Sequence, residues 1–306
     1  MNIEKGKING SQLFFLAAGM VMGSILLTSF STDITKHDTW LAVLTALIVF
    51  ILFAQLYSSL SKRFAGMNLI QINDRVYGKY IGKVISLYYL FYFIMILSFN
   101  IRDMGNFYTT FLMTDTPQLF FLASFTLVCA FAVSKGIEVL GRISHIFVII
   151  SSMIIISTLI LLADKMDFSN FLPFFDLSVK EFIQGVHINS SIPFGVAIVF
   201  LTVLSQLRDV DKYSKNFVLG LVFGGIFFII VIVRNIAVLG NIESILTSPS
   251  FQASRLIDMG SVFTRMDVLI GIGHTLMMFL KTSIIFYAAV SALSQFLGLK
   301  SYIPMI

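Results

Sequence analysis

The chain has 306 residues, of which 57% are hydrophobic and only 12% are charged, with a formal net charge of +5. This balance lies far outside that of soluble domains, and the apolar runs of roughly 17 to 25 residues match the width of a bilayer. Backbone groups in lipid must pair internally, and the runs are too long for barrel strands, so we expect an all-α integral membrane protein. The basic residues fall between the apolar runs, which membrane topology explains without a nucleic-acid partner.

Eight apolar runs are the predicted transmembrane helices, at residues 12–33, 40–60, 82–107, 118–134, 141–163, 185–207, 217–240 and 266–297. Together they form one predicted transmembrane domain, residues 1–306. Of the 21 Lys and Arg residues, thirteen lie in the segments on the side of the N-terminus, six lie in the opposite loops and two lie within runs. The positive-inside rule therefore predicts a cytoplasmic N-terminus.

The first run is interrupted near its middle. It reads Gly19-Met20-Val21-Met22-Gly23-Ser24, with two glycines and a serine where a rigid span would carry leucine. Small residues of this kind let a neighbouring helix approach closely in a membrane. The alternative is that the helix opens at Gly23 and Ser24 and offers its main chain to a small zwitterion. A similar interruption in the sixth run favours the opened helix.

The sixth run, residues 185–207, contains Pro193, Phe194 and Gly195. Proline removes a main-chain donor and clashes with the preceding turn, and glycine adds conformational freedom. The polar residues just before them are His187, Asn189, Ser190 and Ser191. A simple proline kink is one interpretation. Interrupted helices in corresponding positions of two halves are also typical of a mid-membrane binding site in transporters, where Phe194 would cover a ligand.

Two further polar residues lie deep in apolar runs. Lys281 is near the middle of the eighth run, and an ammonium group there costs roughly 2.5 to 3.5 kcal/mol, so it is expected to face a partner or a cavity. It is a tethered cation, a proton acceptor or a structural bridge, and Thr282 follows it. Tyr92 is near the middle of the third run, where its hydroxyl also needs a partner.

The seventh run carries two features of a different kind. Gly220, Gly224 and Gly225 predict a face of small residues for close helix packing. Arg234 lies near the outer end of the run, and we expect its side chain to reach the interface there. No nucleotide-binding loop, nucleophile elbow or metal-ligating cluster is found, so neither catalysis nor a cofactor is expected.

Several short motifs, in order along the chain, resemble one known family. They are Met22-Gly23-Ser24-Ile25-Leu26-Leu27, Tyr77-Gly78-Lys79-Tyr80-Ile81-Gly82-Lys83, Thr116-Pro117, Pro193-Phe194-Gly195, Ser250-Phe251-Gln252 with Arg255-Leu256-Ile257, and Thr264-Arg265-Met266-Asp267. Together they resemble the B-subunit family of bacterial spore germinant receptors, membrane proteins related to amino acid permeases.

The resemblance implies the amino acid–polyamine–organocation fold, an inverted repeat of five plus five helices. Residues 1–163 would form the first repeat and residues 164–306 a second repeat of three helices that lacks the last two. It also implies a nutrient germinant, such as an amino acid, as ligand, A and C receptor subunits as partners, and the inner membrane of the spore as location. The predicted ligand-binding residues are Gly23, Ser24, Tyr92, Phe194, Gly195, Lys281 and Thr282. The alternative function is a proton-coupled amino acid permease that uses Lys281.

Overall fold

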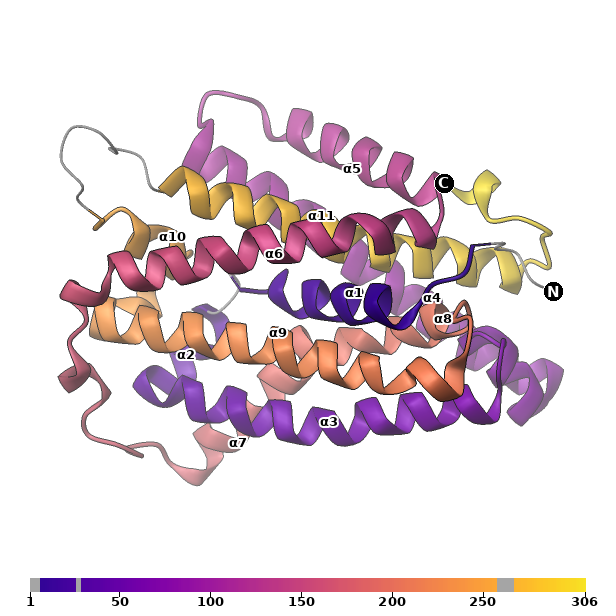
Figure 1. Ribbon diagram of the computed structural model, residues 1–306, viewed down its shortest axis with the longest axis horizontal. Coiled ribbons are helices and arrows are strands. Elements are labelled where there is room, and N and C mark those ends of the chain that lie inside the picture. Colours follow the sequence, from indigo (N-terminus) through magenta and orange to yellow (C-terminus); the bar gives the residue numbers. More distant parts are fainter. Residues whose placement is uncertain (1–5, 26–28, 258–266) are drawn as a thin grey trace.

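The computed structural model describes residues 6–25, 29–257 and 267–306 and is helical throughout that part of the chain (Figure 1). The α-helices are α1 (Gly10–Met22), α2 (Ser29–Thr35), α3 (Thr39–Arg63), α4 (Leu69–Phe107), α5 (Gln118–Ser134), α6 (Ile137–Leu161), α7 (Val179–Asn189), α8 (Phe200–Leu204), α9 (Val210–Leu239), α10 (Pro249–Ser254) and α11 (Asp267–Phe296). Shorter helical turns are η1 (Lys36–Asp38), η2 (Tyr108–Leu112), η3 (Ala163–Lys165), η4 (Phe168–Phe171), η5 (Ser190–Phe194), η6 (Gly195–Val199), η7 (Gly240–Ile245) and η9 (Ile303–Met305).

Six helical stretches of the described residues are long and apolar enough to cross a membrane. They are Ser31–Arg63, Leu69–Leu112, Ile137–Leu161, Val179–Leu204, Val210–Leu239 and Asp267–Phe296. The shorter apolar helix Gly10–Met22 overlaps the first predicted run, and Gln118–Ser134 coincides with the fourth. Large apolar side chains such as Leu52, Val84 and Phe131 are exposed on the outside, as lipid contact requires. The chain is a multi-pass membrane protein.

Helix α1 lies at the centre of the bundle, between α9 on one side and α6 and α11 on the other (Figure 1). Of its apolar residues from Leu13 to Met22, all except the half-buried Phe14 and Phe15 are almost completely buried, although the helix has only 13 residues. A helix that is apolar on all sides is stable only when it is surrounded, and here the surrounding helices take the place of lipid. The first interrupted run is therefore an internal element of the fold.

The close packing of α1 on α9 depends on two of the predicted small residues. A Cβ atom at Gly220 would lie 2.3 Å from the main-chain oxygen of Phe14, and one at Gly224 would lie 2.7 Å from that of Ala18. Because main-chain atoms cannot move aside as a flexible side chain can, only glycine fits at these two positions. This confirms the predicted packing face of the seventh run.

The long helix α4 changes direction at Gly78. Its φ of 77° is the left-handed conformation that glycine adopts without strain, so the segment is two helices joined at one residue. The first part begins with a capping box, in which Asn68 accepts from the main chain of Gln71 and the Gln71 side chain accepts from Asn68. The second part, from Lys79 onward, contains Tyr92 and crosses the bundle.

Candidate functional site

The predicted interruption of the first run is present. Helix α1 ends at Met22, and the following main-chain N–H groups bond back in tight turns, from Ser24 to the Val21 oxygen and from Ile25 to the Met22 oxygen. Residues 26–28 lie outside the described part of the chain, and the next helix, α2, starts at Ser29. Gly23 and Ser24 thus occupy the point where the regular helix stops.

The predicted interruption of the sixth run is also present, in another form. Helix α7 ends at Asn189, the π-helical segment η5 contains Pro193 and Phe194, and a 3-10 segment, η6, begins at Gly195. Proline cannot donate to the regular α-helical ladder, which accounts for the wider turn before it. A Cβ atom at Gly195 would lie 2.9 Å from the Ser190 oxygen, so this turn also needs a glycine.

Lys281 reaches the interruption of the first run. Its Nζ donates a 2.8 Å hydrogen bond to Oγ of Ser24, and the side chain is only 2% exposed. Gly23 makes this approach possible, because a Cβ atom there would lie 2.8 Å from Cβ of Lys281 and 2.9 Å from the Met277 oxygen. The carboxylate of Asp103 on α4 is near enough for its charge to act on Lys281, without a direct ion pair. Gly23, Ser24 and Lys281 therefore form one predicted cluster.

Phe194 and Thr282 are buried, and among the described residues no side-chain hydrogen bond or ring contact joins either of them to this cluster. The ring of Phe194 is fully buried and stacks on Phe50 of α3, with the centroids 5.9 Å apart. The Thr282 hydroxyl is buried and has no hydrogen-bond partner among the described residues. An unsatisfied buried hydroxyl beside a buried ammonium is the kind of group that a ligand or a water molecule satisfies.

Tyr92 and Gly195 belong to a different space, a groove of about 610 Å³ between α3, α4 and the interrupted sixth run. The other residues that line it are Val49, Phe50, Phe53, Tyr57, Ile183, Val186, His187, Ser190 and Ser191. Among the described residues, the buried Oγ of Ser190 has no hydrogen-bond partner, whereas the Ser191 hydroxyl donates to the His187 oxygen. Of the seven predicted residues, Gly23, Ser24 and Lys281 thus form one cluster and Tyr92 and Gly195 line this groove, whereas Phe194 and Thr282 belong to neither.

The two interrupted runs are joined at both ends. At one end, Ile8, just before α1, pairs with the chain just after α8 through main-chain bonds to Gln206 and from Arg208. At the other end, Nδ2 of Asn189 donates a 2.6 Å bond to Oγ of Ser31. The predicted polar residue Asn189 therefore serves helix packing.

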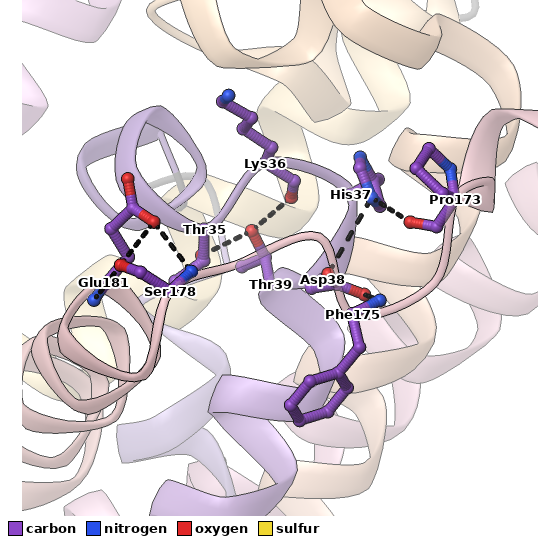
Figure 2. A network of polar contacts seen from close by, with 9 residues as sticks. All are labelled: Thr35, Lys36, His37, Asp38, Thr39, Pro173, Phe175, Ser178 and Glu181. Carbon is purple, nitrogen blue, oxygen red and sulfur yellow. Dashed lines mark hydrogen bonds and ion pairs between the residues drawn. The ribbon is translucent and has the colours of Figure 1, made fainter.

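Figure 2 shows polar contacts among the loop segments before α3 and before α7. The His37 ring lies 2.6 Å from the Pro173 oxygen, and the carboxylate of Asp38 accepts from the Phe175 main chain. Beyond this point, Ser178 and Glu181 form the capping box that starts α7. The segments before α3 and before α7 are therefore held together at this end of the bundle.

Arg234 is the residue for which the sequence interpretation is wrong. Its side chain is 1% exposed and does not reach the interface, because α6, α10 and η7 cover the end of α9. Nη1 donates to Oγ1 of Thr158 at 2.7 Å and Nη2 donates to Oδ1 of Asn235 at 2.8 Å. The sequence shows polar residues within otherwise apolar helices. Only the tertiary structure shows that these polar residues lie close to Arg234.

Glu243 in η7 is the acidic residue associated with Arg234. It is 2% exposed, and Oε1 has no hydrogen-bond partner among the described residues. Burial raises the pKa of Glu243 to about 8, and the positive charge of Arg234 opposes that rise. The two groups are not within ion-pair distance, since the described ion pairs involve other residues. Arg234 is thus held by neutral partners.

A small cavity of about 30 Å³ lies between Arg234 and the end of α1. Its walls are formed by Met22, Ile25, Ser151, Ile154, Ile155, Val231, Arg234, Ser250, Ile270, Gly273, His274 and Met277. The cavity thus extends from Arg234 to Met22 and Ile25, the residues on either side of Gly23 and Ser24.

Comparison with known proteins assigns the family. The family described as spore germination protein matches residues 7–303. The chain belongs to the spore germination protein family. This confirms the resemblance that the sequence motifs indicated.

Individual relatives are distant but similar over most of their length. Spore germination protein KB of Bacillus subtilis is 25% identical, over 94% of this chain and 78% of its own. Spore germination protein B2 of the same organism is 24% identical, over 91% of this chain and 77% of its own. Spore germination protein GerQB of Bacillus cereus is 22% identical, over 68% of this chain and 58% of its own.

Proposed function

We propose that this chain is the membrane subunit of a nutrient germinant receptor and binds a small germinant, of the amino acid class, near the middle of the membrane. The ligand-binding residues in this proposal are Gly23, Ser24, Tyr92, Phe194, Gly195, Lys281 and Thr282. The observation that carries it is the bond from Lys281 to Ser24 at the point where α1 stops. A buried ammonium group in a membrane bundle is retained at a cost of several kcal/mol, which a functional role explains.

The proposal includes the finer features of the fold. The eight apolar runs would be helices of a five-plus-five inverted repeat, with residues 1–163 as the first repeat and residues 164–306 as part of the second. The contacts that join the two interrupted runs at both ends support such a pairing. The receptor would lie in the inner spore membrane with its N-terminus in the cytoplasm, associated with A and C subunits.

Binding would act through the interrupted helices. A ligand that contacts the Ser24 hydroxyl competes with Lys281 for it, so occupancy changes the contact between α1 and α11. A ligand shifts a conformational equilibrium only by its differential affinity for the two states, and loss of this bond is one such difference. Partner subunits would detect the resulting movement.

The test is germination of spores that carry variants, against a panel of amino acids and sugars. We expect Lys281→Met and Tyr92→Phe to change which nutrients act, or the concentration at which they act, at normal protein level. Lys300→Met, at an exposed residue near the C-terminal end of the described chain, is the matched control. An unchanged nutrient panel in both site variants contradicts the proposal.

A second function, a proton-coupled amino acid permease, is favoured by the same buried lysine. A desolvated lysine exchanges its proton more readily than a free one and can carry it between the two sides. Uptake of labelled amino acids into proteoliposomes distinguishes the functions. Substrate-specific accumulation driven by a proton gradient, and lost in Lys281→Met, supports the permease; binding without accumulation supports the receptor.

A further inference from the structure

Arg234 is the largest of the almost completely buried side chains among the described residues, and the proposed function does not use it. A guanidinium group remains charged in proteins, so it cannot escape the cost of burial by losing its proton. Buried charges are normally paired with an opposite charge. The surroundings of Arg234 therefore require an explanation.

The hydrogen bonds of Arg234 are directed to neutral groups. Three of its N–H groups are used, one toward Thr158 and two toward the Asn235 amide oxygen at 2.8 and 3.3 Å. The guanidinium has five N–H donors, so two remain without a partner among the described residues. No described carboxylate lies within 4.0 Å of it.

The cavity beside Arg234 has the size and the lining for a small anion. Its volume of about 30 Å³ exceeds the roughly 10 to 15 Å³ that one water molecule needs, so it admits two or three heavy atoms. Ser151, Ser250 and His274 add polar groups to walls that are mostly apolar beside Arg234. Nδ2 of Asn235 donates to Oγ of Ser250 at 3.0 Å, which fixes that hydroxyl beside the cavity. A bulky or doubly charged anion does not fit these dimensions.

We propose that this cavity binds a small monovalent anion, a carboxylate group or a halide, held by Arg234 between α6, α9, α10 and α11. The anion supplies the negative charge that Thr158 and Asn235 lack. It accepts hydrogen bonds from the two remaining N–H groups, which the planar guanidinium presents as a fork. Met22 and Ile25 also line the cavity, so occupancy supports the chain where α1 ends. The inference does not rest on the proposed function.

Cys129 provides the assay, because this buried thiol is the single cysteine of the chain. A thiol-reactive fluorogenic dye reports its exposure as the purified full chain unfolds in neutral detergent. The Tm is measured in gluconate, a monovalent anion too large for the cavity, and then as chloride or formate replaces gluconate at constant ionic strength. We expect a saturable rise in Tm with formate or chloride, because a ligand that binds only the folded state stabilises it.

Variants assign that effect to the cavity. Arg234→Gln removes the charge and should abolish the rise in Tm, whereas Arg102→Gln, at an exposed arginine on α4, should leave it intact. Should Arg234→Gln fail to fold, Ile154→Phe fills the cavity while Arg234 stays, and should abolish the rise as well. The inference is overturned if the wild-type Tm does not depend on the small anions. It is also overturned if the Tm of folded Arg234→Gln or Ile154→Phe rises as much as that of the wild type, and the cavity then holds only water.

The class of anion is distinguished by a matched pair of small molecules. Formate and formamide are of the same size but only formate is charged, and both are tested in gluconate buffer without chloride. A larger Tm rise with formate than with formamide, lost in Arg234→Gln, assigns the site to a carboxylate group. Equal effects of the two, with the chloride effect retained, assign it to a halide. If spores that carry this protein did not germinate in response to any amino acid, that result would contradict the proposed function. It would not change the Tm measurement of anion binding.

Discussion

Nζ of Lys281, in the last long helix, donates to Oγ of Ser24, 257 residues earlier in the chain, at the point where α1 ends. The bond connects two largely buried parts of the bundle, since α1 is enclosed by other helices and most of α11 is buried. Its charged donor makes it stronger than a bond between neutral groups, but no described carboxylate lies within ion-pair distance of the ammonium. The ammonium at this interrupted helix is therefore suited to exchange the hydroxyl for a ligand group.

Replacing Lys281 separates a functional from a structural role. Lys281→Met keeps a flexible apolar side chain of similar length and removes the buried charge, a change that is often neutral or stabilising. We expect the Tm of the purified protein to be unchanged or higher while the germination response is lost. A fall in Tm with a normal response would instead identify Lys281 as a structural bridge.

Ser24→Ala is the complementary change, and we expect it to destabilise the protein by about 1 to 3 kcal/mol. It leaves the buried ammonium of Lys281 without its 2.8 Å hydrogen bond, and an unsatisfied buried group costs about that much. The dye assay on Cys129 measures the Tm, and the double variant Ser24→Ala/Lys281→Met should recover the loss. Additive effects of the two changes would contradict a direct interaction.

Gly220→Ala should destabilise the bundle by about 1 to 3 kcal/mol or more, because overpacking against main chain cannot be relieved. The new Cβ would lie 2.3 Å from the Phe14 oxygen and force α1 away from α9. Gly273→Ala is the matched control, since its nearest neighbour is a side-chain atom of Ile154 at 3.4 Å, an ordinary contact. Equal Tm values for the two variants would show that α1 and α9 are not in such close contact.

The parts of the structure that the sequence predicted are those governed by local chemistry. The apolar runs follow from the length of a bilayer span, and the interruption at Pro193 follows from a missing donor. The packing face at Gly220 and Gly224 was visible as a spacing of four residues. None of these needs knowledge of distant contacts.

The parts that the sequence did not predict depend on how the helices are rotated against each other. Tyr92 and Lys281 were expected near one ligand, yet Tyr92 lines the groove beside α3 whereas Lys281 faces Ser24. Arg234 was expected at the interface, but Thr158, 76 residues earlier, and the segment after α9 enclose it. The sequence pattern of an apolar run with a polar residue near its end is the same whether that residue is buried in the bundle or exposed at the interface.

Stability should depend on pH through Glu243. Its pKa is raised to about 8 in the folded protein, so the folded state binds a proton more tightly than the unfolded state between about pH 4.5 and pH 8. The free energy of unfolding should therefore fall across this window as pH rises, by on the order of 1 kcal/mol per pH unit. Glu243→Gln should flatten this dependence of Tm on pH, and Glu138→Gln, which removes a carboxylate from an exposed ion pair with Arg142, should not. A slope of the same size in Glu243→Gln would assign the dependence to other groups.

Orientation in the membrane can be measured with single introduced cysteines, because the buried thiol of Cys129 gives little background. Lys180 lies in the first turn of α7 and Lys212 in the first turn of α9, and both are exposed. With the N-terminus in the cytoplasm, Lys180→Cys should react with a membrane-impermeant maleimide in intact protoplasts, and Lys212→Cys only after permeabilisation. We expect this orientation because the basic residues, among them Lys212 and Lys215, are concentrated on the side of the N-terminus. Labelling of Lys212→Cys in intact protoplasts, with Lys180→Cys protected, would reverse the assigned sides and with them the direction from which a ligand approaches.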